Sequence, residues 1–143
     1  MGEELAGANV GRSYSLAATS IAIFTFTLFF LYPRYLSGEA NASLFQVSIV
    51  VMGVATFSFV LSSFYYYCAA VGRIEDAARA SYSRLADRFW LLGCLLLLLD
   101  PSLILFTIGL VGAGSVWLVF WVIYLIVVIK YFPTIQTAKA GSE

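Results

Sequence analysis

The sequence predicts an all-α membrane protein in which four transmembrane helices form one antiparallel bundle. Hydrophobic residues make up 62% of the 143 residues and charged residues only 11%, whereas a typical soluble protein is about 45–50% apolar. The apolar residues also fall into four continuous runs, each close to the about 20 residues that a helix needs to cross a bilayer. We therefore expect one domain, residues 1–143, with the lipid bilayer as its surroundings.

The four predicted spans have clear apolar sequences between polar or glycine-containing connections. They are residues 14–32, 44–70, 89–111 and 114–132. The runs are continuous rather than alternating, which favours helices over the strands of a membrane barrel. Pro33 and Gly38 mark the end of the first span. Gly109, Gly112 and Gly114 allow a tight turn between the third and fourth spans.

The distribution of basic residues indicates an orientation. With four spans, the N-terminus, the loop at residues 71–88 and the C-terminus lie on one side of the membrane. That side has every Lys and Arg of the chain except Arg34. Because cytoplasmic segments of membrane proteins are enriched in Lys and Arg, we expect both termini to be cytoplasmic.

Residues 71–88 form the one long polar segment between spans. Its alanines and the i,i+4 pair of Glu75 with Arg79 favour helix, so the neighbouring spans are expected to extend into the cytoplasm. Its arginines are candidate contacts for an anionic lipid or a partner protein, and they are Arg73, Arg79, Arg84 and Arg88. Acidic residues are mixed among them, so a solvated helix that only sets the orientation is the alternative interpretation.

Asp100 and Pro101 interrupt the most hydrophobic run of the chain. Asp100 lies near the middle of the predicted third span, where a carboxyl group costs roughly 2.5–3.5 kcal/mol to insert. Pro101 removes the hydrogen-bond donor for the Leu97 carbonyl, so we expect a kink there, or two half-helices with Asp100 as an N-cap. Broken helices within membranes tend to line cavities or ion sites. Asp100 is therefore a candidate site for a proton or a small cation.

The other spans have hydroxyl groups at the depth predicted for Asp100. The ones that can complete an ion-binding or proton-binding site are Tyr124, Thr25, Thr56 and Ser58. Structural roles are the alternative. Hydroxyl groups commonly join membrane helices, at about 0.6 kcal/mol per hydrogen bond, and a neutral Asp100 bonded to Tyr124 would fix the packing of the bundle.

The residue types in the chain argue against several kinds of function. There is no histidine, which excludes histidine-ligated haem and Ser-His-Asp catalysis. Cys68 and Cys94 form no CxxC pair, and intramembrane aspartyl proteolysis needs two aspartates where the spans have only Asp100. We therefore expect no enzyme activity, no cofactor and no metal site. The net charge of zero gives no reason to expect nucleic-acid binding.

Two functional hypotheses follow from these features. The isolated carboxyl group of Asp100 predicts a subunit of an ion or proton channel or transporter. Four helices with short connections enclose little volume, so a pore would require a homo-oligomer or another membrane protein as partner. The alternative is a non-catalytic membrane adaptor or assembly subunit, which binds its partner protein or anionic lipid through the arginines of residues 71–88.

Overall fold

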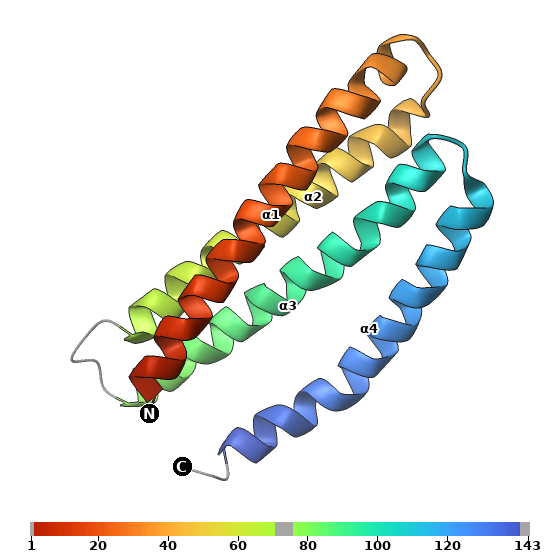
Figure 1. The fold of residues 1–143 in the computed structure, drawn as a ribbon. Helices are drawn as coiled ribbons and strands as arrows, with labels where there is room; N and C mark the ends of the chain where they lie inside the picture. The colour runs from red at the N-terminus through yellow and green to blue at the C-terminus, as the bar shows by residue number, and fades with distance from the viewer. Residues whose placement is uncertain (1, 71–75, 141–143) are drawn as a thin grey trace.

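The computed structural model consists of four long helices joined by short connections (Figure 1). It describes residues 2–70 and 76–140. The helices are α1 (Gly2–Leu36), α2 (Ala42–Ala70), α3 (Asp76–Thr107) and α4 (Val111–Ala140). All four are long and apolar enough to cross a membrane. The prediction of an all-α protein with four transmembrane helices is therefore confirmed.

Successive helices run in opposite directions, so the connections alternate between two ends of the molecule (Figure 1). The short-loop end has the α1–α2 turn at residues 37–41 and the α3–α4 turn at residues 108–110. The terminal end has the start of α1 and the end of α4. Gly38 and Gly109 have φ angles of 77° and 79°. This left-handed conformation is strained for other residues, so these two glycines let the chain reverse within a few residues.

The helix ends differ from the predicted ends of the spans. α1 continues through Pro33 to Leu36, beyond the end that Pro33 predicted. α3 begins at Asp76, so the basic segment that follows is helical, as its alanines indicated. α3 ends at Thr107 rather than at residue 111, and α4 begins at once after the turn. α3 also passes through Pro101 as a single helix, so the two half-helices are not formed.

α2 is the central helix of the arrangement. It packs against α1 on one side and α3 on the other, while α1 and α3 meet only briefly. The α2 face toward its neighbours has a fully buried residue at every seventh position, and these residues are Ser48, Ala55, Ser62 and Ala69. Small residues at such a spacing allow membrane helices to approach closely. Phe59, which is also fully buried, fills the space beside this stripe.

α4 packs against α3 alone among the described helices, and Figure 1 shows it as the outer member of the row. Two tryptophans attach it. The indole nitrogen of Trp117 donates a 3.0 Å hydrogen bond to the Leu98 carbonyl, and that of Trp121 donates a 2.8 Å bond to the Leu95 carbonyl. Both acceptors lie in the stretch of α3 just before its proline. These bonds set the alignment of α4 along the axis of α3.

The α3–α4 contact is closest near the turn. The Ser102 hydroxyl donates a 2.8 Å hydrogen bond to the Gly114 carbonyl. A Cβ atom at Gly114 would lie 2.9 Å from the Phe106 ring, which is too close for a side chain. Gly114 therefore belongs to α4 and permits close approach of two helices, whereas the sequence had suggested a role in the turn.

The outside of the molecule is covered by large apolar side chains. Phe29 is 75% exposed and Phe120 is 61% exposed, and similar residues follow the outer faces of all four helices. In water such a surface would be unstable, whereas lipid chains are as apolar as these side chains. The lipid bilayer is therefore the environment that this surface fits.

Candidate functional site

Asp100 is fully buried where α3 packs against α2. The Ser48 hydroxyl of α2 donates a 2.5 Å hydrogen bond to its Oδ1 atom. The other oxygen, Oδ2, is buried and has no hydrogen-bond partner among the described residues. Buried polar atoms are almost always hydrogen-bonded, and one without a partner costs about 1–3 kcal/mol. Helix packing alone therefore does not explain this carboxyl group.

Asp100 lies well inside α3, away from its short-loop end. It is seven positions from Thr107 at the end of α3, which is about 10 Å along a helix. Ser48 lies at a similar distance from the start of α2 at Ala42. Half of a hydrocarbon core is about 15 Å, so a carboxyl group at this depth lies inside the hydrocarbon layer when the helix ends at its surface.

Tyr124 does not take part in the site. The bonds of Trp117 and Trp121 to α3 set the alignment of the two antiparallel helices, and this alignment places Tyr124 beside Cys94. Cys94 lies between Asp100 and the terminal end of α3. The predicted hydrogen bond between Asp100 and Tyr124 is therefore not formed, and Ser48 is the partner instead.

The other three predicted hydroxyl groups also bind elsewhere. Thr25 is exposed on α1 and donates a 2.9 Å hydrogen bond to a carbonyl of its own helix. The hydroxyls of Thr56 and Ser20 lie 2.9 Å apart and join α2 to α1. Ser58 is buried and donates to a carbonyl of its own helix at 2.7 Å. None of these bonds includes Asp100, so the structure does not bring these three hydroxyls together with it.

Ser48 is the site residue that the sequence prediction missed. Its position on α2 was visible in the seven-residue spacing of buried small residues that it shares with Ala55, Ser62 and Ala69. This spacing identifies the face of α2 that meets other helices. A serine on that face near the start of α2 is a natural partner for a buried carboxyl group on α3.

A second group of polar contacts joins three helices nearer the terminal end. Tyr66 of α2 donates a hydrogen bond to the Asp87 carboxyl of α3. The Arg12 guanidinium of α1 lies over the Trp90 ring of α3, 4.8 Å from its centre. The first contact joins α2 to α3, and the second joins α1 to α3 at this end. They also give Asp87 a partner, in contrast to the free oxygen of Asp100.

The predicted lipid-binding or partner-binding arginines lie on the first turns of α3. Arg84 and Arg88 are both exposed and are one helical turn apart. The Nε atom of Arg84 donates to a carbonyl of its own helix at 3.3 Å. Arg79 is half-buried and makes contacts of its own. Arg73 lies outside the described residues.

Two of the surface pockets lie beside α1, and neither includes Asp100. One, of about 240 Å³, lies between α1 and α3 and includes Arg34. The other, of about 490 Å³, lies between α1 and α2 and includes Thr25 and Thr56. A route from either of these pockets to Asp100 would need a change in the packing, because Asp100 is fully buried.

The chemistry of the site is that of a carboxyl group with one bound and one free oxygen. The chain matches no protein-family model, and no curated protein and no solved structure is similar enough to match it. The functional argument therefore depends on the geometry. Oδ2 can take up a proton or provide an oxygen ligand to a small cation, and the Ser48 hydroxyl adds a second oxygen beside it.

Proposed function

We propose that this small polytopic membrane protein is a subunit of an oligomeric proton or small-cation channel or transporter. Asp100 is the group that binds the ion. The observation that supports the proposal is its buried Oδ2 atom, which has no hydrogen-bond partner among the described residues. Ionisable residues within membranes are rare and usually functional.

The surroundings of Asp100 favour ion binding over a purely structural role. An ionised carboxyl group that is buried without a cationic partner is strongly disfavoured. The described contact of Asp100 is a neutral hydroxyl, that of Ser48. A proton or a bound cation would neutralise the negative charge of the buried carboxyl group. The proposal places the path for the ion where subunits meet.

Replacement of Asp100 by asparagine is expected to lower proton flux at least about ten-fold, because asparagine keeps the shape of the side chain but cannot release a proton. The measurement uses liposomes with purified protein and an internal pH-sensitive dye, with flux started by a potassium gradient and valinomycin. Asp100→Glu should keep part of the flux. Repeating the measurement with sodium or potassium as the only permeant ion separates proton from cation transport.

Ser115→Ala is the matched control for this experiment. Ser115 is exposed on α4 and donates only to a carbonyl of its own helix, so its loss should leave the flux unchanged. Equal flux from wild type and Asp100→Asn, or no flux of any tested ion from either protein, would contradict the proposal.

A second candidate function is favoured by the exposed arginines at the terminal end. Arg84 and Arg88 present two positive charges on one side of α3, beyond its apolar part. Each such charge adds about 1 kcal/mol of attraction to an anionic surface. A non-catalytic adaptor or assembly subunit would bind an acidic partner protein or anionic lipid there, and Asp100 would then be dispensable.

Charge reversal separates the two functions. If the adaptor function holds, Arg84→Glu combined with Arg88→Glu should remove at least about nine-tenths of a cross-linked membrane partner, since two repulsive charges replace two attractive ones. The partner is quantified by mass spectrometry after cross-linking in native membranes. Asp100→Asn should then keep the same partner at its full amount. A charge-reversed protein that retains its cross-linked partners would rule out binding through these arginines.

A further inference from the structure

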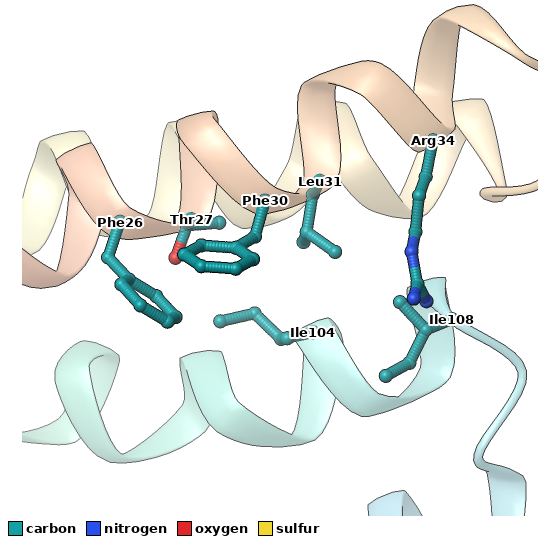
Figure 2. Close-up of a pocket in the computed structure, with 7 residues that line it drawn as sticks. All are labelled: Phe26, Thr27, Phe30, Leu31, Arg34, Ile104 and Ile108. Carbon is teal, nitrogen blue, oxygen red and sulfur yellow. The ribbon is translucent and has the colours of Figure 1, made fainter.

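An apolar groove lies between α1 and α3 near the short-loop end (Figure 2). We call it the α1–α3 groove. Its walls are Phe26 and Phe30 of α1, Ile104 of α3 and Ile108 of the turn that follows α3, and its volume is about 240 Å³. α1 and α3 meet toward the terminal end, where Arg12 lies over Trp90. They separate toward the short-loop end, and the groove fills the space between them.

Arg34 is the polar group at the mouth of this groove. Figure 2 shows its guanidinium extending from α1 toward Ile108, just after the end of α3, across the end of the groove nearest the short loops. No hydrogen bond or ion pair joins this guanidinium to another described residue. Apart from Arg34, the basic residues whose side chains the structure describes lie toward the terminal end, and they are Arg12, Arg79, Arg84, Arg88 and Lys130. Arg34 therefore places a single positive charge beside an apolar groove.

The length of the α1–α3 groove suits one leaflet of a bilayer. From Arg34 to Phe26 the groove follows α1 for eight residues, which is about 12 Å. One leaflet has a hydrocarbon layer of about 15 Å. A molecule in the groove would therefore have its charged end at the membrane surface and its apolar end within the hydrocarbon layer.

We propose that the α1–α3 groove binds an acyl chain of an anionic phospholipid, whose phosphate group contacts Arg34. Charge complementarity selects the headgroup, because the guanidinium pairs well with phosphate oxygens. The length of the groove, close to the thickness of one leaflet, favours an acyl chain as the occupant. A helix of a second subunit is an outcome that the experiment below distinguishes.

Native mass spectrometry of the full-length protein tests this proposal. The protein is released from detergent micelles after incubation with equal amounts of phosphatidylglycerol and phosphatidylcholine. Wild type should retain phosphatidylglycerol preferentially. Arg34→Gln should lower that retention about five-fold, equivalent to about 1 kcal/mol for one basic residue. Arg34→Lys should restore most of it, and Ile104→Trp, which fills the groove, should lower the retention of both lipids.

Lys130→Gln is the matched control, because it removes one basic residue toward the opposite end of the molecule. It should leave the retention of phosphatidylglycerol unchanged. An unchanged lipid preference in Arg34→Gln would overturn the proposal, and so would an equal loss in Lys130→Gln. If Ile104→Trp alters the ratio of monomer to dimer but not lipid retention, a second copy occupies the groove and the proposal is wrong. Arg34 is exposed, so its variants test the proposal even if Ile104→Trp does not fold.

Discussion

Leucine at position 93 is expected to destabilise the protein by about 3 kcal/mol, because overpacked cores lose about 1–3 kcal/mol and this site is unusually tight. A Cβ atom on Gly93 of α3 would lie 2.8–2.9 Å from ring atoms of Phe59 on α2. Phe59 is fully buried, so its ring has no free space to enter. α2 and α3 would therefore have to separate. The measurement is an unfolding titration with sodium dodecyl sulfate in mixed micelles, followed by circular dichroism.

Gly53→Leu is the control for this substitution. Gly53 lies within α2, and a Cβ atom there would meet nothing within 4 Å. This variant should unfold at nearly the wild-type detergent concentration. Phe59→Ala should restore part of the stability of Gly93→Leu, since it removes the ring that causes the clash. The same loss of stability in the Gly93 and Gly53 variants would show that helix packing at Gly93 is looser than the structure has it.

The double substitution Asp100→Leu with Ser48→Ala is expected to keep the stability of wild type or raise it by about 1 kcal/mol, while proton flux is lost. Replacing both partners of a buried hydrogen bond with apolar groups is often neutral or stabilising. Ser48→Ala alone should instead cost about 1–3 kcal/mol, because the carboxyl group loses its hydrogen-bond donor. The same detergent titration measures the stability, and the liposome assay measures the flux.

Ser58→Ala provides the comparison for the loss of a buried serine. Its hydroxyl bonds only to its own helix, so the change in stability should stay near 0.6 kcal/mol or below, the average for hydrogen bonds in membrane proteins. A loss of about 3 kcal/mol or more in the Asp100→Leu, Ser48→Ala protein would mean that Asp100 is a structural link between α2 and α3. The channel proposal would then lose its main support.

The fold was predictable from hydropathy because each helix is apolar over its whole membrane-crossing length. The end of α3 was not, since Ile108 and Leu110 in the following turn are as apolar as the helix itself. The reversal there depends on the positive φ of Gly109, which hydropathy does not register. When a turn between two apolar helices is itself apolar, glycine is the main feature of the local sequence that indicates where the chain turns.

The candidate site was predictable in part. Asp100 stands out as a carboxyl group among leucines, and its burial follows from the need to remove it from lipid. Its partner could not be chosen by depth, since α2 has five serines, of which only Ser48 donates a hydrogen bond to Asp100. Tyr124 was misplaced because an α3 that ends at Thr107 aligns differently with α4. Depth along a helix does not specify its face, whereas the spacing of buried small residues does.

The attachment of α4 to a single neighbour has a consequence for how the protein is made. Among the described residues, all contacts of α1 with α2 and of α2 with α3 are formed without α4. The buried Phe59 and the hydrogen bond between Ser48 and Asp100 belong to those first three helices. A nascent chain whose fourth helix has not yet been synthesised therefore already contains the three helices that pack together. We expect α4 to join them from the lipid side, so that the order of synthesis is also an order of assembly.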